Sequence, residues 1–69
     1  MKLIMKTEFD NLRLNSNHNY ETDSNGDKQV VKIYHGELLI AKKIKQNKSI
    51  RFFGISGYEQ YLTPEDTLK

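Results

Sequence analysis

Apolar and polar residues alternate through the middle of the chain, on either side of two short turn signals. The first signal is Asn25-Gly26, a pair that tolerates the positive φ values of a type I′ turn. Counting outward from it places Tyr20 opposite Val31, and counting outward from the second signal, His35-Gly36, places Val31 opposite Ile40. The two turns therefore predict the same apolar sheet face, which a slip of one residue would scatter. That face comprises Tyr20, Val31, Ile33, Leu38 and Ile40.

The opposite face of the predicted sheet is mixed rather than polar, so we expect a terminal segment to cover part of it. This second face carries Val30, Lys32, Tyr34, Leu39, Ala41 and Lys43.

A further strand is predicted over residues 49–53, after the polar residues 46–48. A two-residue loop before this strand would place Phe53 and Ile55 on the apolar face. A three-residue loop would instead place Ile50 and Phe52 there. The pattern leaves both registers open.

The ends of the chain give weaker signals. Residues 3–9 and 12–14 are strand candidates, and the asparagine-rich residues 15–19 form a loop or an irregular edge strand, because asparagine is depleted in strands. Near the C-terminus, Thr63 can cap a helix that begins at Pro64, although only one turn fits before the chain stops. The predicted fold is mostly β, a small antiparallel sheet or meander of four or five strands with a short C-terminal helical turn. It is either open or closed into an SH3-like barrel.

The length of 69 residues limits the chain to one small domain, which we expect to span residues 1–69. The chain has no cysteine, so neither a disulfide nor a thiolate metal site is expected. The longest apolar run, residues 38–41, is too short to cross a membrane, and the first residues lack the apolar stretch of a signal peptide. We therefore expect a cytoplasmic protein.

Asn, Lys, Ile and Tyr make up 25 of the 69 residues, a composition typical of low-GC genomes. A short chain of this kind favours a phage or mobile-element product, whose place of action would be the host cytoplasm.

No pattern of residues points to catalysis, a cofactor or a metal ion, so we expect a protein that is not an enzyme. His18 and His35 have no sequence neighbour that would orient an imidazole for acid–base chemistry. Asp23, Asn25 and Asp27 resemble the start of a calcium loop, but the glycine and glutamate that such a loop needs at its sixth and twelfth positions are missing.

Charge is unevenly distributed along the chain. Residues 28–51 hold seven basic residues and one acidic residue, whereas the segments on both sides each have a net charge of −2. A basic sheet with aromatic residues can hold single-stranded nucleic acid by phosphate attraction and base stacking, although lysines also keep sheets soluble. The candidate nucleic-acid-binding residues are Lys42, Lys43, Lys45, Lys48 and Arg51.

The segment 57–62 offers a candidate surface for a partner protein, because tyrosine is a favoured interface anchor. Tyr58 and Tyr61 are three residues apart and would share one face of a helical turn. Together with Arg51 and Phe53 they form the predicted partner-binding site. In the alternative interpretation, both tyrosines pack on the sheet and complete its core.

Two classes of function follow from these patterns. The leading hypothesis is a non-enzymatic, protein-binding regulator or inhibitor that acts on a host or cognate protein or on a nucleoprotein complex, with segregated charge to steer the encounter. The alternative is a nucleic-acid-binding β-domain that uses residues 28–51. Assembly of copies through a sheet edge is a further expectation.

Overall fold

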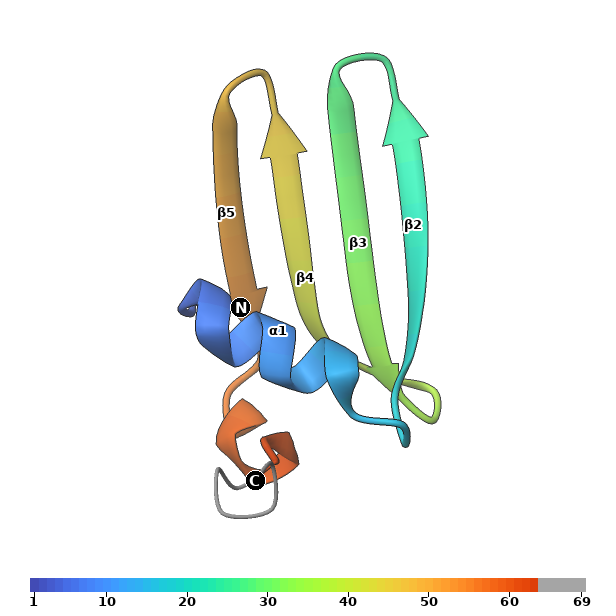
Figure 1. The fold of residues 1–69 in the computed structure, drawn as a ribbon, viewed down its shortest axis with the longest axis vertical. Helices are drawn as coiled ribbons and strands as arrows, with labels where there is room; N and C mark the ends of the chain where they lie inside the picture. Colours follow the sequence, from blue (N-terminus) through green and yellow to red (C-terminus); the bar gives the residue numbers. More distant parts are fainter. Residues whose placement is uncertain (64–69) are drawn as a thin grey trace.

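The computed structural model describes residues 1–63 as a five-stranded antiparallel sheet with one α-helix packed against it (Figure 1). The strand order is β1-β5-β4-β3-β2, so the last four strands form a meander and β1 adds to its far side. The sheet is open and not closed into a barrel, which confirms the predicted mostly-β fold in its open form. The elements are β1 (Lys2–Leu3), α1 (Lys6–Leu14), β2 (Asn19–Asn25), β3 (Lys28–His35), β4 (Leu38–Gln46), β5 (Ser49–Gly54) and the 3₁₀ helix η1 (Tyr58–Tyr61).

Both predicted hairpins are present, but each turn lies one residue further along the chain than predicted. In the first hairpin Asn25 pairs with Lys28, so the two loop residues are Gly26 and Asp27. Gly26 has φ +61°, which a glycine at the first central position of a tight hairpin loop adopts without strain. Tyr20 consequently pairs with Ile33. This shift of two residues keeps every side chain on its predicted face.

A β-bulge in β4 changes which residues of that strand face the helix. Tyr34 pairs with Leu39 and Ile33 pairs with Ala41, so Ile40 is the extra residue between them. Ile40 and Ala41 are both completely buried. Beyond the bulge, Lys43 pairs with Val31 and therefore shares its face.

Three predictions about β4 are wrong, two of them because of the bulge. Ala41 and Lys43 lie on the face of Val31, not on the opposite face, because the extra residue reverses the alternation. Leu38 was expected in the core, but its position beside the hairpin tip leaves it 48% exposed.

The bulge also decides the register of β5. The loop before β5 has two residues, since Gln46 pairs with Ser49. Phe52 pairs with Lys43 and so faces the helix, which is the result expected from a three-residue loop. Both predicted registers assumed an unbroken β4.

The segment 6–14, part of which was predicted as strand, forms the nine-residue helix α1. The Met5 backbone N–H donates to Oε1 of Glu8 at 3.0 Å, which caps the first turn, and Lys6 pairs with Asp10 one turn later at 2.7 Å. These local interactions outweigh the strand preference of Phe9 and its apolar neighbours.

The core lies between α1 and one face of the sheet. Phe9 and Leu12, three residues apart on the helix, are fully buried, and the Phe9 ring lies 5.2 Å from the Phe52 ring, measured between centroids. Tyr58 of η1 closes the same core at 7% exposure. The buried hydrophobic cluster comprises Phe9, Leu12, Ile33, Ile40, Ala41 and Tyr58.

The remaining segments are the loop between α1 and β2 and the residues near the C-terminus. Residues 15–18 connect α1 to β2 as a loop, one of the two predicted forms. The helical turn predicted from Thr63 onward lies outside the described residues, and η1 ends just before it. Within residues 1–63, no helix has the length and apolar character needed to span a bilayer.

Candidate functional site

No described element covers the side of the sheet opposite α1, and we call this side the open face (Figure 1). Directly paired residues share a face, so Val30, Ile44 and Arg51 form one row across β3, β4 and β5. The apolar residues of the open face are Leu3, Val30, Tyr34, Leu39, Ile44 and Phe53. None of them belongs to the buried cluster or to the partly buried residues that pack against it.

Four cations surround this apolar centre, and two carboxylates lie at its β2 margin. Lys32 and Lys42 are paired directly across β3 and β4, an arrangement that costs free energy because like charges face each other. The two ion pairs found among residues 1–63, Lys2–Glu59 and Lys6–Asp10, involve neither of these lysines. The charged residues of the open face are Lys28, Lys32, Lys42, Arg51, Glu21 and Asp23.

The open face is not flat at the end nearest the β4–β5 loop. A shallow hollow of about 350 Å³ lies there, with Ile44 and Phe53 as its apolar lining. Lys28 and Arg51 contribute positive charge to the same hollow. Slightly further along, the Lys42 ammonium lies 5.8 Å from the centroid of the Phe53 ring, within cation–π range. The hollow therefore combines apolar surface with cationic groups.

The five candidate nucleic-acid-binding residues do not form one surface. Lys42 and Arg51 lie on the open face, whereas Lys43 and Lys45 lie on the helix side of the sheet. Lys48 is in the β4–β5 loop. Lys42 and Lys43 are consecutive in a regular strand and must point to opposite faces, a separation that the sequence alone could have indicated.

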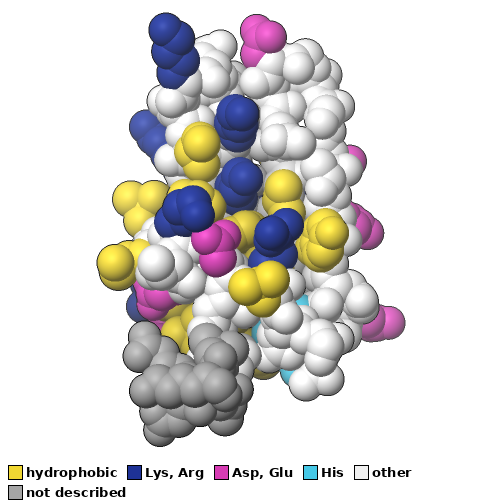
Figure 2. Space-filling model, viewed as in Figure 1, with side chains coloured by type: hydrophobic (Ala, Val, Ile, Leu, Met, Phe, Trp, Pro, Cys, Tyr) yellow, Lys and Arg dark blue, Asp and Glu magenta, His cyan; other side chains and the backbone are white. Residues whose placement is uncertain are grey.

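A second hollow, the helix-side groove, lies between α1 and the sheet and has a volume of about 410 Å³. Figure 2 shows this side of the molecule, where basic side chains lie among apolar ones. Two of its cations already have partners: Lys6 pairs with Asp10, and the Arg13 guanidinium carbon lies 5.9 Å from the Tyr20 ring centroid. Sequence reasoning missed this groove because it requires the helix. Its lining comprises Lys6, Phe9, Asp10, Arg13, Leu14, Tyr20, Thr22, Val31, Lys43 and Phe52.

The structure separates the four predicted partner-binding residues. Arg51 and Phe53 lie on the open face, with Phe53 half-buried. Tyr58 is buried in the core, so it presents little surface to a partner. Tyr61 is half-buried and packs against the core from η1.

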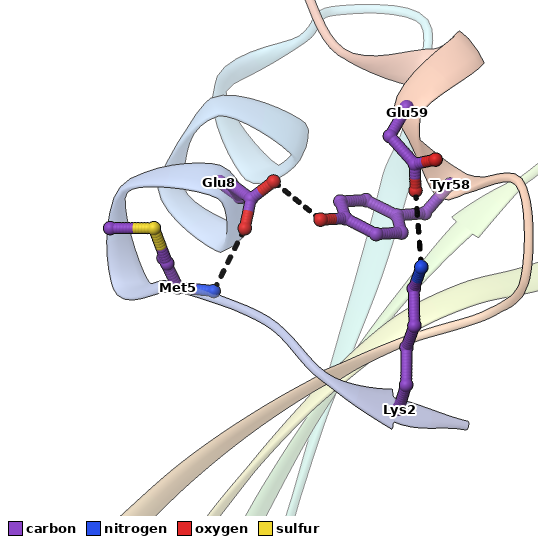
Figure 3. A network of polar contacts seen from close by, with 5 residues as sticks. All are labelled: Lys2, Met5, Glu8, Tyr58 and Glu59. Carbon is purple, nitrogen blue, oxygen red and sulfur yellow. Dashed lines mark hydrogen bonds and ion pairs between the residues drawn. The ribbon is translucent and has the colours of Figure 1, made fainter.

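The Tyr58 hydroxyl has a structural partner, shown in Figure 3. It donates a hydrogen bond to the Glu8 carboxylate, whose other oxygen accepts the Met5 backbone N–H. Nearby, Lys2 and Glu59 form an ion pair at 3.7 Å, and the Lys2 ammonium lies 5.2 Å from the Tyr58 ring centroid. This network ties β1, α1 and η1 together.

The same hydrogen bond shifts the pKa of both groups that it joins. Donation from Tyr58, followed by the Met5 N–H, lowers the pKa of Glu8, because both stabilise the carboxylate. The pKa of Tyr58 is raised to about 12, chiefly because the neutral phenol donates to Glu8.

His18 and His35 lie close together at the end of the sheet that carries the β3–β4 turn, with ring centroids 5.2 Å apart. Tyr61 packs against both rings. His18 is buried, and its Nδ1 lies 2.9 Å from the Leu12 carbonyl oxygen. Residues 1–63 contain no group of three or more His, Cys, Asp or Glu side chains arranged to hold a metal ion. The contacts that the pair makes are those of packing between the α1–β2 loop, β3 and η1.

Comparisons with protein-family models, with curated proteins and with solved structures find no match. Three of the described features that offer binding chemistry are the open face, the helix-side groove and the exposed edge of β2. Of these, the open face combines apolar residues outside the core cluster with cations that form no ion pair among residues 1–63.

Proposed function

We propose that this protein is a non-enzymatic, protein-binding regulator or inhibitor that docks on its partner through the open face. The observation that carries the proposal is the set of neighbouring apolar side chains Val30, Ile44 and Phe53 on the open face, which no described segment covers. Large contiguous apolar patches on a monomer often mark a binding site.

The charges of the open face define the partner further. Lys42 faces Lys32 across β3 and β4, and Glu21 lies opposite Lys32 on its other side, so an acidic group of the partner beside Lys42 would offset the remaining repulsion. Lys28 and Arg51 extend the positive rim to the hairpin end. The expected partner surface therefore has an apolar centre and acidic groups around it.

Nucleic acid is the second candidate ligand, supported by the proximity of Lys42, Arg51 and Phe53. The centre of the open face favours protein instead. Val30 and Ile44 are aliphatic and offer no flat ring on which a base could stack, and Glu21 and Asp23 at the margin would repel phosphates. The composition supports a phage or mobile-element origin, and in that case the partner belongs to the host cytoplasm.

A matched pair of isoleucines tests the proposal. Ile44 lies on the open face, and Ile50 lies on the helix side of the neighbouring strand. The tagged wild type, Ile44→Asp and Ile50→Asp are used to capture partners from nuclease-treated extract of the producing or host cells. Melting temperatures are measured in parallel, and Ile44→Ala serves as the milder variant if Ile44→Asp unfolds.

We expect the wild type and Ile50→Asp to retain one or more specific proteins, and Ile44→Asp to lose them with little change in melting temperature. Loss of an interface hot spot costs more than about 2 kcal/mol, a drop in affinity of about thirtyfold. Equal capture by Ile44→Asp and wild type would contradict the proposal. Binding that disappears with nuclease treatment and falls steeply with salt would favour the nucleic-acid alternative.

A further inference from the structure

The outer edge of β2 is the long free edge of the sheet. β2 is the last strand in the sheet order, and all seven of its residues, Asn19–Asn25, are exposed. Its pairing with β3 continues without a register shift from Asn19 to Asn25. At the opposite edge, β1 has only two residues. The unpaired N–H and C=O groups of an edge strand form a template onto which another strand can add.

β2 lacks most of the features that usually block such addition. Proteins protect sheet edges with short strands, prolines, bulges or charged side chains, lysine above all. β2 is longer than a typical strand, runs without a bulge and contains neither proline nor lysine. Its only charged side chains are Glu21 and Asp23, which both point to the open face.

The charges indicate what kind of strand would fit. On the open face, a neighbouring strand would meet Glu21 and Asp23, two residues apart. On the helix side it would meet Thr22 and Tyr20, and Tyr20 is 56% exposed. We propose that the β2 edge binds an extended segment of a partner protein, with lysine or arginine at alternate positions and β-branched or apolar residues between them.

A second copy of this chain is a poor occupant for the same edge. In an antiparallel pair, directly opposite residues lie on the same face of the sheet. In a two-fold symmetric β2–β2 pair, the two opposite residues therefore both have odd numbers or both have even numbers. The central registers place Glu21 against Asp23, Glu21 against Glu21, or Asp23 against Asp23. Each of them sets carboxylates opposite each other, which is unfavourable.

The edge site uses the backbone groups of β2, which docking on the open face does not require, and it is tested separately. The probe is an acetylated nine-residue peptide of alternating lysine and valine, added to the ¹⁵N-labelled full chain. One control peptide has glutamate in place of lysine, and a second keeps the lysines but carries N-methyl groups on the amides of one edge. Amide shifts and hydrogen-exchange protection in β2 are the readouts.

We expect the lysine peptide to protect β2 amides, and both control peptides to bind at least about tenfold more weakly, because the first reverses the cross-strand charges and the second removes donors. Glu21→Gln should weaken binding several-fold, whereas Glu37→Gln, the same change at an exposed hairpin tip, should leave it unchanged. Equal binding of the N-methylated peptide, or shifts that avoid β2, would overturn the proposal. β2 protection that grows with protein concentration alone would identify a second copy as the occupant and overturn it as well.

Discussion

Replacing Ile33 by alanine, and separately Ile44 by alanine, tests whether one sheet face is covered and the other open. Ile33 is completely buried beneath α1, whereas Ile44 is half-buried on the open face and makes no contact with the core cluster. A buried isoleucine that is cut back to alanine costs about 2–5 kcal/mol of unfolding free energy, because apolar area is lost and a cavity remains. A partly exposed one should cost about 1 kcal/mol or less.

These magnitudes are large for a chain of 69 residues, whose total unfolding free energy is expected to be about 3–10 kcal/mol. Urea denaturation followed by circular dichroism measures both variants, and Ile33→Val, with an expected cost of about 0.5–1.5 kcal/mol, replaces Ile33→Ala if that variant does not fold. Equal losses for Ile33→Ala and Ile44→Ala would refute the reasoning, because they would mean that the open face is covered as well.

Three other predictions concern stability and titration. Gly54→Ala should lower the unfolding free energy by about 1–3 kcal/mol in urea titrations, because an added Cβ would lie 3.1 Å from both Ile4 Cγ2 and Tyr58 Cγ. Lys42→Glu should raise the melting temperature slightly by replacing a like-charge cross-strand pair, and it should weaken partner capture at the same time. Tyr58 should titrate near pH 12, as followed by ultraviolet absorbance. Because its pKa is raised in the fold, the stability from its bond to Glu8 is complete below about pH 10 and is lost as the pH rises through 12, and Tyr58→Phe should remove this alkaline loss. A Lys42→Glu variant with undiminished capture, or a Tyr58 that titrates near the ordinary tyrosine value of 10, would contradict these expectations.

The hairpins could be predicted from the sequence because their signals are local. In each hairpin, a glycine marks the turn, and the alternating residues on either side indicate the two strands and their faces. An error of two residues in the register leaves those faces unchanged. The bulge at Ile40 has no such signal. It depends on fitting both Ile40 and Ala41 into a core with α1, and this tertiary requirement reverses the faces of everything that follows in β4 and β5.

For α1 and for the candidate site as well, only the local features could be predicted from the sequence. Residues 6–14 contain few strong helix signals apart from the Lys6–Asp10 spacing, and packing of Phe9 and Leu12 on the sheet accounts for the rest. Arg51 and Phe53 were predicted as partner-binding residues beside the two tyrosines, and the structure places both of them on the open face. The central pair Val30 and Ile44 could not be recognised, since apolar residues in a strand usually indicate a core.

Photo-crosslinking tests the proposed role of the open face most directly. A benzophenone side chain is placed at position 44 or at position 50, on opposite faces of neighbouring strands. Each protein is then irradiated in the cells that contain the partner, and crosslinked proteins are identified by mass spectrometry. Docking through the open face predicts a specific protein crosslink from position 44 and none of the same species from position 50. A crosslink from position 50 alone, or nucleic acid as the only crosslinked species at position 44, would contradict it.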